Sequence, residues 1–288
     1  MISVETDERV MTIALDRPEK RNALTLDGML DIVRALDRAD ADDDVRAVVV
    51  TGRGTAFCAG ADLSAGEDSF AAEHIAGTSG QAAAGEPQSV RDAGGVLALR
   101  IFASTKPIIA AVNGPAIGGG ASLTLPMDVR LCSTDARYAF PFVRRGITPE
   151  GCSSWFLPRI VGIAAAQEWV LTGRMIGSDE AYTRGLVHQL HEPQDLLPAA
   201  YRLAREIADG AAPVSVALSR QMLWQMLGAS HPMEAHQLES RGVLSRGASP
   251  DAREGVRAFL ERRTPFFTNK VSTDMPGFYP WWSEPTFS

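Results

Sequence analysis

Apolar residues gather in five short runs in the first half of the chain, and several of these runs end at a glycine, a proline or an Asn-Gly pair. Valine, isoleucine and alanine fill two of them, "VRAVVVTG" and "KPIIAAVNG", which is typical of strands buried on both faces. The pattern therefore predicts strands near residues 9–15, 45–52, 106–114, 128–133 and 136–141.

Helical periodicity separates these runs and dominates the chain beyond about residue 150. The first helix is expected after Thr25 as N-cap, and its apolar face comprises Met29, Ile32, Val33 and Leu36. The acidic run at 40–44 reads as a solvated turn. Later helices are expected near residues 163–171, 195–209, 213–227, 232–247 and 250–262. Strands that alternate with helices predict an α/β fold, followed by a helical region.

Residues 64–95 differ from the rest, because they are rich in glycine, alanine and serine and poor in apolar residues. A segment of this length is more than a connector, and we predict a lid over a functional site. We divide the chain into a core at 1–195, a helical region at 196–270 and an aromatic, proline-rich tail at 271–288. Within the tail, Trp281 and Trp282 are expected to pack on the core or on a neighbouring subunit.

Composition narrows the class of protein. The 288 residues carry a net charge of -7, with a pI of about 5.3, which favours neither nucleic acid nor an anionic membrane as partner. No apolar run is long enough to span a bilayer, and the N-terminus lacks the pattern of a signal peptide. The three cysteines, Cys58, Cys132 and Cys152, form no CxxC pair and read as small core residues. A reducing, cytoplasmic setting is expected.

Three polar residues outside the glycine-rich loops are expected to be structural. His188 and His191 stand three positions apart without a third ligand at metal-binding spacing, so we predict no metal site. Asp128 is expected to pair with a backbone group or an arginine.

Two loops carry the strongest candidate chemistry. "AFCAGADL" at 56–63 and "NGPAIGGGASL" at 113–123 each follow a predicted buried strand, where ligands of α/β proteins bind. Each glycine of the 118–120 triplet costs about 1 kcal/mol relative to alanine in a helix, so bare backbone is needed there. Two backbone N–H groups aimed at one point could hold an oxyanion. The alternative is a tight turn that packs a helix on a strand; a dinucleotide-binding loop is excluded because the G-x-G-x-x-G spacing is absent.

Four motifs in order, "RPEKRNALT", "VVVTGRGTAFCAGADL", "KPIIAAVNGPAIGGGASL" and "SPDAREGVRAFLERRTPFF", resemble the enoyl-CoA hydratase/isomerase, or crotonase, superfamily. The resemblance runs from about residue 3 to 267. It implies a ββα-superhelix core, a helical C-terminal region that forms trimers or dimers of trimers, and an acyl-CoA thioester substrate. It implies no metal or redox cofactor, since coenzyme A is part of the substrate.

The resemblance also assigns roles to positions of this chain. The backbone N–H groups of Ala61 and Gly119 are similar to the oxyanion hole of the family. The positions expected around the CoA adenine and phosphates are Arg21, Ala23, Ala59, Asp62 and Leu63. Two C-terminal positions, Phe267 and Lys270, resemble residues that reach CoA, sometimes from a neighbouring subunit. Ordinary surface charge remains the alternative for Arg21 and Lys270.

The catalytic carboxylates depart from the hydratase pattern. Ser122 and Phe142 occupy the positions of the two hydratase glutamates, and neither can activate water alone; we expect Phe142 to line the substrate site instead. Glu150, in "TPEGCSS", resembles the single base of the 3-enoyl-CoA to 2-enoyl-CoA isomerases, although the stretch also resembles the chromodomain-Y proteins. Ser153 or Ser154 is expected to cap the next helix. The alternative role for Glu150 is a carboxylate stabilised by that helix's dipole.

One carboxylate is sufficient for an isomerase, because it removes a proton from C2 and returns it at C4. A raised pKa in an apolar pocket would suit Glu150 to this shuttle. Three alternatives remain open. The first is a hydratase that uses Glu150 with ordered water or a lid residue, for which the candidates are Glu67, Asp68 and Glu73. The second is other thioester chemistry, such as hydrolysis, decarboxylation or dehalogenation. The third is a non-catalytic acyl-CoA-binding protein.

Overall fold

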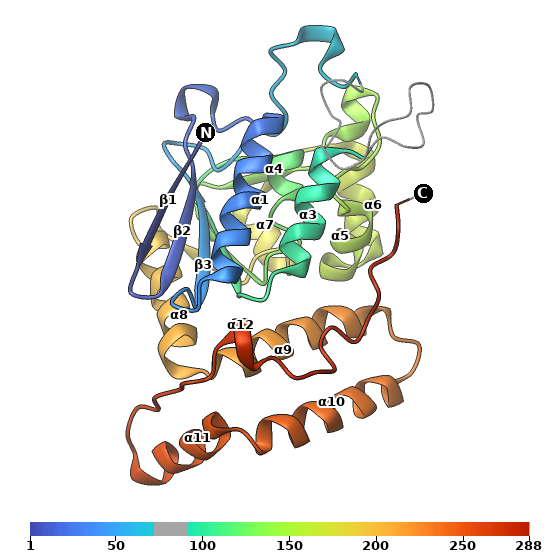
Figure 1. Cartoon of the computed structure of the whole chain (residues 1–288). Coiled ribbons are helices and arrows are strands. Elements are labelled where there is room, and N and C mark those ends of the chain that lie inside the picture. Colours follow the sequence, from blue (N-terminus) through green and yellow to red (C-terminus); the bar gives the residue numbers. More distant parts are fainter. Residues whose placement is uncertain (72–90, 288) are drawn as a thin grey trace.

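A computed structural model describes residues 1–71 and 91–287 (Figure 1). Its main sheet has six strands in the order β1-β2-β3-β4-β6-β9, and only the β1–β2 pair is antiparallel. The strands are β1 (Ile2–Asp7), β2 (Val10–Leu15), β3 (Ala47–Gly52), β4 (Ile108–Val112), β6 (Val129–Ser133) and β9 (Gln189–His191). A smaller sheet has the order β5-β7-β8 and contains β5 (Ala116–Ile117), β7 (Arg137–Ala139) and β8 (Ile176–Gly177).

All five predicted strands are confirmed, as β2, β3, β4, β6 and β7. The pattern missed β1, because its second half is exposed and acidic and it pairs with β2 alone. The prediction that the chain beyond residue 150 is all helical is wrong. There β8 joins the small sheet and β9 extends the edge of the main sheet, and both are too short for periodicity to reveal.

Helices cover both faces of the main sheet. On one face lie α1 (Leu26–Ala41) and α3 (Ala93–Ala103), and on the other lies α8 (Leu196–Gly210) (Figure 1). Alternate residues of one strand face opposite helices: Val48 packs with the α1 and α3 side, and Val49 with α8. This double coverage explains the continuous apolar runs of β3 and β4. The α/β prediction is therefore confirmed.

The helix predictions agree well with the structure. Thr25 is the N-cap of α1, and its hydroxyl accepts a hydrogen bond from the Gly28 N–H. The five later predictions correspond to α6 (Ile163–Thr172), α8, α9 (Pro213–Gln225), α10 (Pro232–Gly247) and α11 (Pro250–Glu261). Two shorter helices lie where the sequence indicates helix starts, α4 (Gly119–Ser122) after the glycine triplet and α5 (Ser153–Val161) after Glu150, and α7 (Ser178–Thr183) precedes β9. Unpredicted are α3, which begins at the edge of the glycine-rich segment, and α12 (Val271–Asp274).

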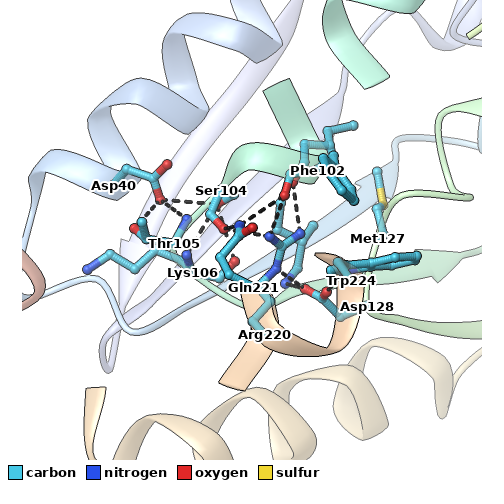
Figure 2. Close-up of polar contacts among 12 residues, drawn as sticks. Asp40, Phe102, Ser104, Thr105, Lys106, Met127, Asp128, Arg220, Gln221 and Trp224 are labelled. Atoms are coloured by element: carbon cyan, nitrogen blue, oxygen red, sulfur yellow. Dashed lines mark hydrogen bonds and ion pairs between the residues drawn. The ribbon is translucent and has the colours of Figure 1, made fainter. Parts of the chain in front are cut away.

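A cluster of polar side chains connects α9 to the core through hydrogen bonds and an ion pair (Figure 2). The predicted pairing of Asp128 is confirmed, since its carboxylate accepts from Ile108 N at 2.7 Å, Arg220 Nε at 2.8 Å and Trp224 Nε1 at 2.8 Å. The guanidinium of Arg220 also donates to the carbonyls at the end of α3, including that of Ile101. The position of α9 is thus set by directional contacts.

The acidic run at 40–44 is not simply a solvated turn. Asp40 lies inside α1, and its carboxylate accepts from Ser104 Oγ at 3.0 Å and from the Thr105 N–H at 3.0 Å (Figure 2). Asp43 accepts from Ser272 in the tail. Both carboxylates therefore connect α1 to later segments of the chain.

The C-terminal helices extend below the core in Figure 1, and α10 and α11 lie beyond α9. Several large apolar side chains on them are more than half exposed: Leu223, Val243, Leu244, Val256, Phe259 and Leu260. In the tail, Trp281 and Trp282 are half-buried, and their ring centroids lie 4.9 Å apart. The ring of Tyr279 packs against both. No helix among the described residues has the length and apolarity that crossing a membrane requires.

Candidate active site

The two loops singled out in the sequence lie side by side. Cys58 and Ala116 form a parallel bridge, in which Cys58 N donates to Pro115 O at 3.0 Å and Ile117 N donates to Cys58 O at 2.9 Å. The side chain of Asn113 also connects the two loops. Its Oδ1 accepts from the Gly52 N–H at the end of β3, and its Nδ2 donates to Gly54 O. The loops after β3 and β4 therefore form one rigid unit.

The glycines of this unit have different physical reasons. A Cβ on Gly60 would lie 2.6 Å from Ile117 O, and a Cβ on Gly120 would overlap the backbone of Cys58, so both allow the loops to approach. Gly118 has φ of +53°, a conformation that side chains rarely adopt. At Gly119 a Cβ would meet nothing closer than 3.7 Å. A Cβ on Gly119 would thus fit at ordinary contact distance from Glu150 and Leu24, and a Cβ on Gly118 would meet no atom within 4 Å.

Among the described residues, neither predicted oxyanion-hole donor, the Ala61 N–H or the Gly119 N–H, donates to a backbone acceptor outside the regular helices and strands. Leu24 bridges to Ala61 by accepting from Asp62 N and donating to Gly60 O, so the Ala61 N–H points to the opposite side of this short strand. Gly119 is the first residue of α4, where helical N–H groups lack partners. Because α4 has four residues, we expect the N–H itself, and not a helix dipole, to provide the interaction.

Both donors border a cavity of about 730 Å³. Apolar side chains of α1 and α3, among them Met29 and Leu97, form part of its wall, and Phe142 closes another part. The cavity is large enough for an acyl chain with its thioester. Phe142 is 3% exposed and also packs on Phe140, so its contact with a substrate stays a prediction.

Glu150 lines the same cavity, next to the donor loop. A Cβ on Gly119 would lie 3.7 Å from Glu150 Oε1, which places this carboxyl beside the predicted oxyanion site. Among the described residues, neither Glu150 Oε1 nor the buried Ser122 Oγ completes a hydrogen bond. The turn that carries Glu150 is held by the Ser153 N–H and hydroxyl, which both donate to Glu150 O.

The environment of Glu150 favours its protonated form. Its pKa is raised from 4.5 to about 7, chiefly because burial disfavours the charged carboxylate. The hydroxyl of Ser122 lies close enough to oppose part of this shift, and the negative charge of Asp92 adds to it. A carboxyl with a pKa near neutrality can both accept and return a proton.

The expected serine cap of α5 is wrong. Cys152, in a left-handed conformation with φ of +56°, occupies the N-cap position and makes no side-chain capping hydrogen bond. Ser153 lies inside the helix, and its hydroxyl faces back to the Glu150 carbonyl at 2.6 Å. The serine therefore stabilises the Glu150 turn instead of capping the helix N–H groups.

The residues expected around CoA separate into two groups. Ala59, Asp62 and Leu63 line the cavity, and the Asp62 carboxylate accepts from Arg17 at 2.9 Å. The other four do not line it within this chain: Arg21, Ala23, Phe267 and Lys270. Of these, Phe267 lies near α11, where a Cβ on Gly255 would be 3.6 Å from its ring, and Lys270 is the N-cap of α12. Contact of the four with CoA stays a prediction.

The remaining site predictions have these outcomes. Glu67 and Asp68 lie in an exposed turn that does not line the cavity, and Glu73 lies outside the described residues. His188 accepts from the Arg130 N–H at 3.1 Å, a structural contact. Within residues 1–71 and 91–287, no three His, Cys, Asp or Glu side chains are placed to hold a metal.

The sequence reasoning missed two groups beside Glu150. Asp92 and Gly94, at the start of α3, line the cavity next to its carboxyl. An Asp two residues before a Gly-Gly pair is a helix-capping signal that could have been found. Nothing in the sequence indicates that this helix start faces residue 150.

Comparison with known proteins shows the family to which the chain is similar. The sequence profile described as enoyl-CoA hydratase/isomerase matches residues 5–270. The chain is 40% identical over 264 residues to the enoyl-CoA hydratase ACTT3 of Alternaria alternata, covering 91% of this chain and 84% of that protein. It is 36% identical to a putative enoyl-CoA hydratase of Thermus thermophilus, covering 93% of this chain and all of that protein.

Solved structures agree. A probable enoyl-CoA hydratase/isomerase from Mycobacterium abscessus superposes with a TM-score of 0.84 at 35% identity, covering 94% of this chain and 99% of that one. Relatives named as enoyl-CoA hydratases, at 36–40% identity over more than 90% of this chain, define the class of protein as an enzyme. The chain belongs to the enoyl-CoA hydratase/isomerase family, within the crotonase superfamily.

Proposed function

We propose that this enzyme moves the double bond of a 3-enoyl-CoA to the 2-position, with Glu150 as its single acid–base group. The observation that carries the proposal is the place of Glu150: its carboxyl borders the cavity beside Gly119 and has a pKa of about 7. At neutral pH about half of such carboxyls are ionised and able to accept a proton.

The reaction follows from this arrangement. The Glu150 carboxylate takes a proton from C2, and the electron pair moves toward the thioester oxygen to form a dienolate. The N–H groups of Ala61 and Gly119 stabilise the negative oxygen. The protonated Glu150 then donates the same proton to C4, which leaves the double bond between C2 and C3. The carboxylate is regenerated, so no second catalytic group is needed.

The second candidate is an enoyl-CoA hydratase, as several relatives are named. The unpartnered Ser122 Oγ beside Glu150 Oε1 favours it, because two such groups could bind a water molecule. In that case Glu150 would act on this water, and no lid carboxylate would be required.

The substrate and assembly complete the proposal. An acyl-CoA thioester occupies the cavity, with Ala59, Asp62 and Leu63 along its CoA end. The exposed apolar side chains of α9 to α11 join copies of the chain into a trimer or a dimer of trimers. Phe267 and Lys270 then reach CoA from a neighbouring subunit. The enzyme works in the cytoplasm, where its free thiols stay reduced.

The test follows the absorbance of the conjugated enoyl thioester with 3-hexenoyl-CoA and, separately, with 2-hexenoyl-CoA. The proposal expects this absorbance to rise with 3-hexenoyl-CoA and to stay constant with 2-hexenoyl-CoA. Glu150→Gln should not convert 3-hexenoyl-CoA. The matched control is Glu67→Gln, which removes an exposed carboxylate and should leave the rate unchanged. Faster hydration of 2-hexenoyl-CoA than isomerisation of 3-hexenoyl-CoA would contradict the isomerase and favour the hydratase.

A further inference from the structure

The carboxyl of Glu150 occupies a space that the first turn of α3 leaves open. A Cβ on Gly94 would overlap Glu150 Oε2, so only a glycine leaves room for the carboxyl in this position. On its other side, Oε1 faces Gly119. The base is therefore held between two glycine backbones, one from the donor loop and one from α3.

A second carboxylate borders the same point. The position that a Cβ on Gly94 would occupy is 3.2 Å from Asp92 Oδ1 and overlaps Glu150 Oε2, so the two carboxyl groups are close neighbours. Asp92 is also the N-cap of α3, where Oδ1 accepts from the Gly95 N–H at 2.6 Å. This hydrogen bond fixes the Asp92 side chain at the wall of the cavity.

Two thiols and a hydroxyl near Glu150 carry no charge at neutral pH. Burial raises the pKa of Cys58 to about 12 and also raises the pKa of Cys152, so both thiols are neutral. The Ser122 hydroxyl does not ionise in this range. Among the described residues, Asp92 is therefore the charged group whose proximity raises the pKa of Glu150.

Two arginines lie in the same region. Arg91 directly precedes Asp92 and opposes part of the rise in the pKa of Cys152, and Arg145, after β7, lines the cavity. Neither is among the groups that shift Glu150, whereas Asp92 is.

We propose that Asp92 is a positioning residue for the Glu150 base: it caps α3 so that the Gly94 turn receives the Glu150 carboxyl, and its negative charge keeps that carboxyl able to hold a proton between C2 and C4. Without this charge the carboxylate would be a weaker base, and the helix start would stabilise the charged form. The proposal rests on the proposed function only for the proton transfer; the carboxyl pair exists whatever the reaction.

The first experiment titrates Glu150 directly by carbon NMR of glutamate-labelled protein without substrate, with Glu150→Gln to assign the signal. Asp92→Asn keeps the cap, because asparagine caps helices as well as aspartate, and removes the charge. The midpoint of Glu150 should fall by about half a pH unit or more in this variant. Asp92→Ser, which also caps without charge, should show the same fall.

The matched control is Asp27→Asn, which removes another carboxylate from the cavity wall and should leave the Glu150 midpoint unchanged. If Asp92 were only a structural cap, both variants, which keep the cap, would leave the Glu150 midpoint and the melting temperature unchanged. An unchanged midpoint in both Asp92 variants, or an equal shift in the control, would overturn the proposal.

The second experiment measures the pH dependence of kcat/KM with 3-hexenoyl-CoA. In Asp92→Asn, the pH at which kcat/KM falls on the acid side should decrease by the same amount as the NMR midpoint of Glu150. The value of kcat at the pH plateau should also be lower than in the wild type. A shifted midpoint in a protein that does not isomerise this substrate would refute the proposed function and leave the carboxyl pair established. An unshifted midpoint in an active isomerase would refute the role of Asp92 alone.

Discussion

Three backbone positions without side chains determine where the candidate base lies. Gly119 and Gly94 flank the carboxyl of Glu150, and Gly60 lets the two loops approach. A Cβ on Gly94 would overlap only side-chain atoms of Glu150, a Cβ on Gly60 would overlap the backbone of Ile117, and a Cβ on Gly119 would fit at ordinary contact distance. A methyl group at Gly94 would therefore affect the site more than the fold.

Gly94→Ala is expected to separate these effects. Its Cβ would displace the Glu150 carboxyl, and a displacement of about 1 Å can lower kcat by about 100-fold. Alanine also favours a helix over glycine by about 1 kcal/mol, so stability should not fall. Steady-state kinetics measures kcat, and thermal unfolding measures the stability of the variant. Gly210→Ala, where no atom lies within 4 Å of the new Cβ, is the control; equal kinetics in the two variants would contradict the prediction.

The raised pKa of Glu150 also predicts how stability depends on pH. The folded carboxyl keeps its proton up to about pH 7 while the unfolded one loses it near 4.5, so the folded state binds more protons in between. This stabilisation is complete below 4.5 and is lost as pH rises through 7. Glu150→Gln should therefore be more stable than wild type at pH 8, by about 3 kcal/mol, and equal to it near pH 4.

Urea unfolding at both pH values measures this difference. A gap of the same size at pH 4 and pH 8 would mean that the glutamine acts through packing and not through the proton.

At the scale of elements, directional polar contacts and not apolar area alone hold α9 on the core. Arg220 is 6% exposed and connects α9 to Asp128 and to three carbonyl groups at the end of α3 (Figure 2). The same α3 carries Asp92 and Gly94 at its other end. The attachment of the C-terminal helices is therefore continuous with the element that borders the active site.

Arg220→Met should lower the free energy of unfolding by about 3–5 kcal/mol, because it leaves the Asp128 carboxylate buried without its charged partner. Denaturant unfolding measures the loss. Arg34→Ala removes an exposed pair with Asp31 and should cost less than about 1 kcal/mol. Similar losses in both variants would show that the Arg220 cluster contributes no more than a surface pair.

At the scale of the whole molecule, the apolar side chains on the C-terminal helices have no partner within the described chain. Phe259 is 82% exposed and Leu260 74% exposed, on the same helix as the neighbours of Phe267. A subunit contact there would bury these side chains. It would also bring Phe267 and Lys270 close to the cavity of a neighbouring subunit.

Phe259→Asp is expected to reduce the assembly to smaller species and to weaken binding of acyl-CoA, because Phe267 and Lys270 would no longer reach a neighbour. Light scattering after size-exclusion chromatography measures the mass. Leu171→Asp, on α6 and 69% exposed, is the control and should keep the assembly. A monomeric wild-type protein would contradict the predicted trimer.

Much of the fold could be predicted from patterns within short windows. Buried strands such as β3 and β4 are continuous apolar runs, and α10 begins and ends at the residues that its periodicity indicates. Short elements failed, because β8 with two residues has no period to detect. The candidate oxyanion donors were predictable since each lies in a motif of its own loop.

The sequence by itself determined the α/β class, the two glycine-rich loops, the family resemblance and Glu150 as the candidate base, because each depends on residues close together in the chain. Only the tertiary structure decided that Asp92 and Gly94 border Glu150, that Lys270 lies away from the cavity of its own chain, and that Glu150 has a pKa of about 7. The physical reason is that space, burial and charge around a group come from segments distant in sequence, and their distances are set only when the sheet, α3 and the 150 turn pack together.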